Sequence, residues 1–173
     1  MATIPQRENK LQDIIKMLYE QADEIRIVFN NYQNIPAWVK NYPKVNALLN
    51  TFDKYTSNAV WLLLDETVNG YVFVCDDDIK YPQNYIQTMI SKMKEYENKA
   101  VLSLYGEIAL RPFKNYVNGR KGYGFELEIP SDLIVDIVGV GCCVFHTQYL
   151  RPTILNFPDI YCRDMWFSIL AKK

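Results

Sequence analysis

Three consecutive carboxylates, Asp76, Asp77 and Asp78, directly follow the apolar run Tyr-Val-Phe-Val-Cys at residues 71–75. This run lacks alternating polarity and is rich in strand-forming residues, so it predicts a buried β-strand. Because side chains alternate along extended backbone, we expect Asp76 and Asp78 to project together and Asp77 to point elsewhere. Two hard oxygen donors on one side suit Mg²⁺ or Mn²⁺ carrying phosphate, rather than a soft metal. Ligands bind at the carboxyl ends of strands in open α/β sheets, so the triplet indicates a metal–nucleotide site.

A structural interpretation of the same residues is available. Acidic side chains also cap helix N-termini and oppose the helix dipole. A helix is predicted to begin here, because Pro82 is followed by apolar residues at helical spacing: Ile86, Met89, Ile90 and Met93. One aspartate could therefore be a cap, but three in a row exceed what capping needs, and the functional interpretation is favoured.

The composition is that of an ordinary soluble globular protein. The 173 residues suit one domain with a substantial core, and apolar residues make up 49% of them. The net charge of −1 provides no basic field for nucleic acid or an anionic membrane. No apolar stretch is long enough to span a membrane, and the chain begins with a strand-like segment. We therefore expect neither a transmembrane segment nor a signal peptide, and a cytoplasmic location.

The four cysteines, Cys75, Cys142, Cys143 and Cys162, lack the paired CxxC spacing of a zinc site. Cys142 and Cys143 lie in an apolar run, where buried free thiols are common. We expect all four to be reduced, as is usual in a cytosolic protein.

The first hundred residues alternate strand and helix patterns. Strands are predicted at 2–5, 24–30, 45–49 and 71–75, and helices at 7–20, at 57–65 with Ser57 as a cap, and after Pro82. This order predicts an α/β fold with a mostly parallel central sheet and helices on both faces.

The character of the chain changes after residue 100. We expect strands at 100–104, 133–138 and 142–145, a glycine-punctuated segment at 106–130, and a closing helix at 164–173. No repeat or linker interrupts the sequence. We expect a single domain over residues 1–173, with a nucleotide-binding half at 1–100 and an acceptor-binding and catalytic half at 101–173.

Three stretches carry a family resemblance. Ala-Thr-Ile-Pro-Gln-Arg at 2–7, Val-Phe-Val-Cys-Asp-Asp-Asp-Ile-Lys-Tyr-Pro at 72–82 and Cys-Arg-Asp-Met-Trp-Phe at 162–167 resemble nucleotide-sugar-dependent glycosyltransferases of the GT-A fold. The nearest resemblance is to the inverting branch of small bacterial and viral sugar transferases, and it covers essentially the whole chain. It implies a Rossmann-like GT-A domain, a nucleotide-sugar donor (most often a UDP-sugar), a glycan or glycoconjugate acceptor, and Mn²⁺ or Mg²⁺.

The resemblance also implies a nucleotide pocket, formed by the first strand and its turn, the end of the second strand and a later segment: Thr3, Pro5, Arg7, Asn30, Asp53 and Asn58. Arg7 would meet the diphosphate, since a guanidinium pairs well with phosphate oxygens. Residues 54–57 depart from the glycine-containing pattern often found there.

By the same resemblance, the triplet matches the DxD motif. Asp76 would face the ribose, Asp78 would ligate the divalent ion, and Asp77 would bind metal-bound water or orient the loop. A metal that bridges the phosphates stabilises the negative charge that develops on the leaving nucleoside diphosphate.

Two later features match the family's catalytic region. The Gly-Val-Gly turn that ends at Gly141 resembles the glycine turn beneath the donor sugar, although a plain hairpin turn explains it equally well. Asp164 matches the catalytic base that deprotonates the acceptor hydroxyl, or else only caps the last helix. Many relatives carry two acidic residues there, whereas here Arg163 precedes Asp164, so Asp159 supplies the other carboxylate or none does. Inversion at the anomeric carbon depends on the role of Asp164.

Other interpretations stay open at this point. His146 is expected to end a strand as a hydrogen-bonded structural residue rather than to bind metal. A DxD phosphohydrolase fits poorly, because Lys80 stands where such enzymes carry Thr or Val. A nucleotidyltransferase on a related sheet is closer, and Arg163 supports a nucleotide- or glycan-binding module without catalysis. The chain could also be an excised domain of a longer enzyme.

Overall fold

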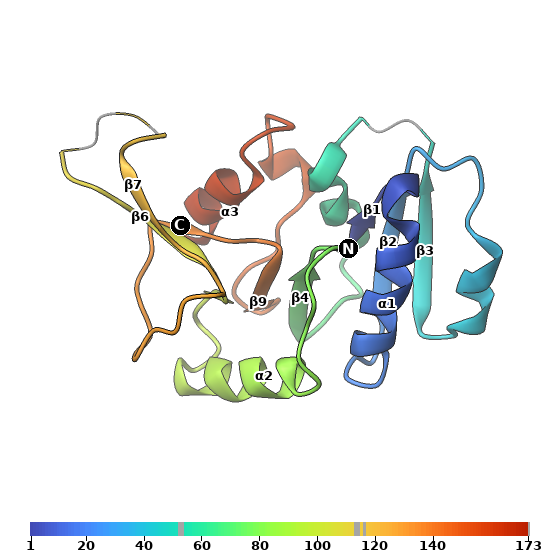
Figure 1. The fold of residues 1–173 in the computed structure, drawn as a ribbon, viewed down its shortest axis with the longest axis horizontal. Coiled ribbons are helices and arrows are strands. Elements are labelled where there is room, and N and C mark those ends of the chain that lie inside the picture. Colours follow the sequence, from blue (N-terminus) through green and yellow to red (C-terminus); the bar gives the residue numbers. More distant parts are fainter. Residues whose placement is uncertain (52–53, 113–114, 116, 173) are drawn as a thin grey trace.

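The structure is a computed structural model that describes residues 1–173 except 52–53, 113–114, 116 and 173. In the described part of the chain, the hydrogen-bonded ladders form three sheets of three strands. Figure 1 shows these sheets side by side along the long axis of the molecule, with β1, β2 and β3 at one end, β4 and β9 in the middle and β6 and β7 at the other end.

The first sheet is parallel. β1 (Ala2–Thr3) pairs with β2 (Ile25–Asn30), which pairs with β3 (Val45–Asn50). The short 3₁₀ helix η1 (Pro5–Arg7) leads into α1 (Glu8–Tyr19), which returns the chain from β1 to β2. The apolar face of α1, made of Leu11, Ile14, Ile15 and Leu18, is buried in one cluster with Ile25, Ile27 and Phe29 of β2. This half follows the predicted strand–helix–strand order closely.

The second sheet is antiparallel, which corrects the expectation of one mostly parallel sheet. β9 (Cys142–His146) lies between β4 (Tyr71–Cys75) and β5 (Leu102–Ser103) and runs opposite to both. The cause lies in the order of the chain, because β9 is reached through the Gly-Val-Gly turn rather than through a crossover helix. That turn brings Gly141 beside the end of β4, where its carbonyl accepts the Asp76 N–H at 2.8 Å.

Helices cover both faces of this second sheet. Successive side chains of a strand point to opposite faces, and the two buried clusters divide accordingly. Cys75, Cys142 and Val144 pack toward Tyr85, Met89 and Met93 of α2 (Tyr85–Glu95). Val74, Cys143 and Phe145 pack toward the 3₁₀ helix η3 (Thr56–Leu63) and α3 (Arg163–Ala171).

An aromatic stack joins η3 to α3. The ring of Trp61 lies parallel to Phe157, at 4.9 Å between centroids, and to Phe167, at 5.3 Å. The predicted helix at 57–65 is thus a 3₁₀ helix over Thr56–Leu63, and the capping role of Ser57 is wrong, because no side chain makes the N-cap hydrogen bond. Phe167 and Trp61 are nearly inaccessible to solvent, so this stack fixes the start of α3 over the middle sheet.

The third sheet is a small antiparallel unit. β6 (Gly106–Ala109) pairs with β7 (Arg120–Tyr123) on one side and with β8 (Ile137–Val138) on the other. The strand predicted at 133–138 is therefore only two residues long, and the glycine-punctuated segment contains two strands that lack a strong sequence pattern. A short 3₁₀ helix, η4 (Ile154–Asn156), precedes α3. In the described residues, no helix is long and apolar enough to cross a membrane.

Candidate active site

The acidic triplet leaves β4 as a turn that is held firmly at its first residue. The backbone N–H of Asp76 donates to the carbonyl of Gly141 and lies 2.9 Å from the hydroxyl of Tyr81. That hydroxyl in turn donates to the Gly141 carbonyl at 2.7 Å. Burial raises the pKa of Tyr81, so the phenol stays protonated and remains a donor. The end of β4, the loop that leads to α2 and the glycine turn are therefore joined at one point.

Arg7 lies against the other two carboxylates of the triplet. Its Nη1 atom is 2.8 Å from Oδ1 of Asp77 and 3.2 Å from Oδ2 of Asp78. The expectation that Asp77 points away from the side of Asp78 is wrong, because the strand ends at Cys75 and the turn that follows no longer alternates. Asp77 is only 2% exposed and its Oδ2 has no hydrogen-bond partner, whereas Asp78 is 35% exposed. Asp78 is thus the accessible carboxylate of this pair.

Asp76 faces the start of α3 instead. The Nη2 atom of Arg163 donates to Oδ1 and Oδ2 of Asp76 at 3.1 and 3.2 Å. The Nε atom of the same arginine is 3.5 Å from Oδ1 of Asp164. One guanidinium therefore lies against the first carboxylate of the triplet and against the carboxylate that we expect to act as a base.

Gly141 and Gly139 leave room for these groups. A Cβ atom added to Gly141 would lie 2.1 Å from Oδ2 of Asp76, and one added to Gly139 would lie 2.0 Å from the ring of Tyr105. Real Cβ atoms do not approach other atoms so closely, so a side chain at either position requires the neighbour to move. The turn is more than a plain hairpin connection, because both of its glycines allow a close approach.

Asp164 lies in the first turn of α3 and has two polar neighbours besides Arg163. The Val140 N–H donates to its Oδ1 at 3.3 Å, and the Tyr105 hydroxyl donates to its Oδ2 at 3.4 Å. Burial raises the pKa of Asp164 above its ordinary value, and the charge of Arg163 opposes that shift. Proton acceptors in enzymes commonly have such a raised pKa.

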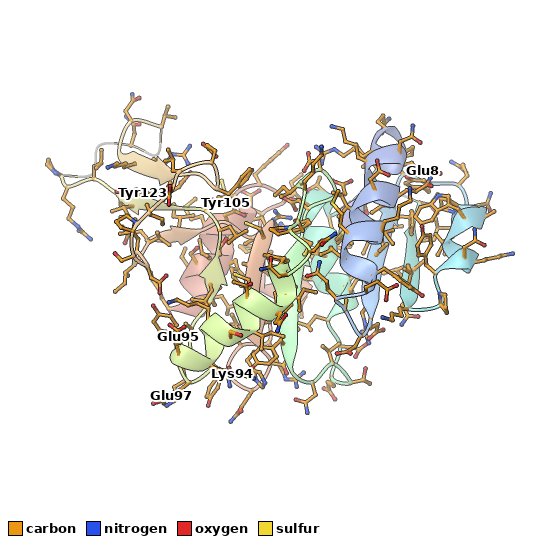
Figure 2. All side chains as sticks on the ribbon, turned by 60° about the horizontal axis from the view of Figure 1, so that its bottom comes forward. Glu8, Lys94, Glu95, Glu97, Tyr105 and Tyr123 are labelled. Carbon is orange, nitrogen blue, oxygen red and sulfur yellow. The ribbon has the colours of Figure 1, made fainter. Side chains whose placement is uncertain are left out.

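Tyr105 stands between the glycine turn and the third sheet. Its hydroxyl also lies 3.4 Å from the Gly141 N–H, and its ring meets Phe125 edge to face at 6.2 Å. Figure 2 shows Tyr105 and Tyr123 on the same side of the molecule, far from Glu8 at the start of α1. No sequence pattern indicates this role, because Tyr105 is one of thirteen scattered tyrosines.

The predicted nucleotide residues divide into two groups. Thr3 and Pro5 lie at the end of β1 and the start of η1, next to Arg7, which reaches the triplet. Asn30 and Asn58 instead hold loops together: their Nδ2 atoms donate to the carbonyls of Thr56 and Asp159, at 3.1 and 2.9 Å. Both asparagines are buried, and Oδ1 of Asn58 has no hydrogen-bond partner. Asp53 lies outside the described residues.

Two further residues are structural. His146 ends β9, and its Nδ1 accepts the Gln148 N–H at 3.2 Å. Its register partner is Tyr71, at the opposite end of β4 from the triplet, which confirms the structural interpretation. Asp159 is exposed and its Oδ1 accepts the Tyr161 N–H at 2.7 Å, so its carboxylate makes a local turn, and the described contacts of the Asp164 carboxylate do not include it.

A divalent cation fits the chemistry of this site only if a bound ligand supplies some of the atoms that coordinate it. The described residues contain no group of three or more His, Cys, Asp and Glu side chains that could hold a metal ion. Mg²⁺ is usually bound through one or two carboxylates together with substrate phosphates and water, rather than by an all-protein cage. Asp78 is exposed enough to serve in this way, and the uncompensated charge of the site suits a cation.

The charge balance of the cluster supports that fit. The carboxylates of Asp76, Asp77, Asp78 and Asp164 each meet the guanidinium of Arg7 or Arg163, and these six side chains together carry an excess of two negative charges when all are ionised. A divalent cation would neutralise them, provided that Asp164 is ionised.

The chain matches a known protein-family model. The family model described as Glycosyl transferase family 2 matches residues 4–151. No curated protein matches the chain significantly. The matched residues include the turn that follows β1, the acidic triplet and the glycine turn.

Proposed function

The chain belongs to glycosyl transferase family 2, a GT-A family whose activity is glycosyl transfer, and on that premise we propose that it moves a sugar from a UDP-sugar to an acceptor hydroxyl with inversion. The acceptor is a glycan or glycoconjugate. Asp164 is the base, Asp78 holds a divalent cation (Mn²⁺ or Mg²⁺), and Asp76 faces the ribose of the donor. A cytoplasmic location stays a prediction.

One observation carries this proposal: the carboxylates of Asp76 and Asp164 come from elements far apart in the chain and meet at Arg163, beside Gly141. A carboxylate that only caps the start of a helix needs no contact with a guanidinium that it shares with another carboxylate. Asp164 instead accepts hydrogen bonds from a backbone N–H of another element and from Tyr105. This arrangement supports a base that faces the end of β4, where the triplet lies.

In the proposed reaction, the acceptor oxygen attacks the anomeric carbon and its proton passes to Asp164. The bond between that carbon and the diphosphate oxygen breaks, and the nucleoside diphosphate leaves with the electron pair. Attack on the face opposite to the leaving group inverts the configuration. A bound divalent cation supplies electrostatic stabilisation of the leaving diphosphate. Arg7, 44% exposed beside Asp78, supplies further positive charge on the same side.

The nucleotide pocket is proposed at the ends of β1 and β2, from Thr3, Pro5 and Arg7, with Asp77 orienting Arg7. Asn30 shapes this pocket by holding the end of β2 to Thr56 of η3, and Asn58 does so by holding η3 to Asp159. Asp53 is proposed as a further nucleotide contact. The buried, unpartnered Oδ1 of Asn58 supports an incoming donor group at this place, because buried polar atoms are normally paired.

The test is donor turnover with a panel of UDP-, GDP- and dTDP-sugars in Mn²⁺, measured as release of the nucleoside diphosphate. The expected result is release from at least one UDP-sugar by the native chain, and loss of release in Asp164→Asn. Release of pyrophosphate from a nucleoside triphosphate would identify a nucleotidyltransferase instead. Tight nucleotide binding without any turnover would identify a binding module.

A further inference from the structure

Arg163 is an unusual residue at its position. It is the first residue of α3 and its side chain is 11% exposed, although a guanidinium is costly to bury without partners. Its partners are the carboxylates of Asp76 and Asp164, and their charges outweigh the effect of burial, so that its pKa is raised. Arg163 is therefore a charged group inside the site.

The geometry restricts what Arg163 can do. Nη2 contacts both oxygens of Asp76, while Nε faces Oδ1 of Asp164, so the two ends of one planar group meet carboxylates from two elements. Gly141 closes the other side of Asp76, since any side chain there would overlap Oδ2. Asp76 thus has little freedom to move while Arg163 is present.

We propose that Arg163 is a positioning residue that fixes Asp76 on the donor side and Asp164 on the acceptor side of the site. This inference rests on the proposed function. Arg163 joins the end of β4 to the start of α3, which carries the proposed base, across an 87-residue separation in sequence. Because the guanidinium of Arg163 lies beside Asp164, its positive charge favours the ionised form of that carboxyl group.

The charged and polar groups recorded beside the Asp164 carboxylate among the described residues come from several elements, and the buried Cys143 thiol of β9 is one of them. Arg163 of α3 is the cation, the Tyr105 hydroxyl and the Val140 N–H are neutral donors, and Asp76 at the end of β4 is an anion. Arg163 is thus the one positive charge that these contacts place beside Asp164. Its removal leaves Asp164 buried near a carboxylate, which disfavours the ionised base.

The experiment compares Arg163→Gln and Arg163→Lys with the native chain. Arg26→Gln is the matched control, because Arg26 is also partly buried and paired with two carboxylates, but in the β2 region. Three quantities are measured: the Kd for UDP with Mn²⁺, the kcat and pH profile of donor turnover, and the pKa of Asp164 by carboxyl ¹³C NMR. Circular dichroism reports the folded fraction of each variant.

Arg163→Gln is expected to retain UDP binding within about threefold and to lose about 100-fold in kcat, the order of effect of a misplaced reacting group. Its Asp164 pKa and the acid limb of its pH profile move to higher pH. Arg163→Lys keeps the acid limb near that of the native chain but not the full kcat, since an ammonium group cannot meet both carboxylates as the planar guanidinium does.

An unchanged Asp164 pKa in a folded Arg163→Gln variant overturns the proposal, and so does a loss of kcat that only follows the unfolded fraction. If the native chain shows no donor turnover and no UDP binding, the proposed function fails. The NMR titration still tests the positioning role in that case, because it requires no substrate.

Discussion

Arg163 and Asp76, 87 residues apart in sequence, are joined by two hydrogen bonds of 3.1 and 3.2 Å from one guanidinium nitrogen to both carboxylate oxygens. The contact links the end of β4 to the start of α3. It occurs directly beside Gly141, whose carbonyl accepts the backbone N–H of Asp76. The acidic triplet is therefore held from two sides before any ligand arrives.

Gly141→Ala should disrupt this arrangement. The new Cβ would lie 2.1 Å from Oδ2 of Asp76, so the carboxylate must leave Arg163 or the turn must shift. We expect donor turnover to fall about 100-fold in a folded protein. Gly122→Ala is the control, because a Cβ on Gly122 meets nothing within 4 Å and should leave turnover unchanged. Equal activity in both variants would show that Asp76 need not be held in place.

Asp164→Asn should separate catalysis from donor binding. The amide preserves the size of the side chain and can still accept the Val140 N–H, but it cannot take a proton from the acceptor. We expect kcat to fall between about 10²- and 10⁴-fold, the range for loss of a general base, while the Kd for UDP with Mn²⁺ stays unchanged. A variant that loses UDP binding would instead assign Asp164 to the architecture of the site.

The raised pKa of Asp164 sets the direction of the pH dependence. Burial raises it in the folded protein, and the base must be ionised, so kcat/KM should decrease as the pH falls through this raised pKa. By linkage, this group favours the folded state most below its ordinary pKa and costs stability above the raised one. A kcat/KM profile measured between pH 4 and 8, about the range in which a carboxyl of raised pKa titrates, should show the acid limb. An apparent pKa at or below the ordinary value would contradict the assignment.

Asp78→Ala should remove metal-dependent nucleotide binding. Asp78 is the accessible carboxylate beside Arg7, and the described residues contain no group of three or more His, Cys, Asp and Glu side chains that could hold a cation without a ligand. The expected result is that Mn²⁺ no longer strengthens UDP binding, as measured by calorimetry. Asp13→Ala, which removes an exposed carboxylate paired with Lys16 on α1, is the control and should bind like the native chain. Metal-dependent binding retained in Asp78→Ala would exclude Asp78 as the ligand.

Ser168→Ala should lower stability through the attachment of α3. The buried Ser168 hydroxyl accepts the Val138 N–H at 2.9 Å and donates to the Asp164 carbonyl at 2.7 Å. Its loss leaves the buried N–H unpaired, which costs about 1–3 kcal/mol of unfolding free energy. Urea unfolding measures this, with the exposed Ser91→Ala on α2 expected to stay within about 0.5 kcal/mol. Equal stability of the two variants would show that water or a local shift satisfies Val138.

The sequence predicted the parts of this fold that depend on local patterns. The parallel first sheet, α1, the strand before the triplet and the closing helix were all predicted from local residue patterns, and their bounds differ from the prediction by only a few residues. The reversal of the middle sheet could not be predicted in this way, because both a parallel and an antiparallel buried strand have the same continuous apolar run as β9.

For the candidate site too, local sequence patterns predicted residues but not the contacts between distant elements. The triplet and Asp164 stood out by residue type and position, whereas their contacts did not. Nothing local to Arg163 indicates that its partner is Asp76, since their pairing depends on how α3 packs on the middle sheet. The alternation rule also failed at Asp77, because it holds only while the backbone stays extended.

The most direct test of the central claim is calorimetric titration of UDP into the native chain, first with Mn²⁺ and then with EDTA. Joint recognition of a nucleotide and a cation predicts binding with a Kd in the range of about 1 μM to 1 mM that the chelator abolishes. Saturable binding of equal strength in both conditions would contradict the metal site at Asp78. The absence of binding in either condition, with the protein folded, would contradict the proposed UDP-sugar donor.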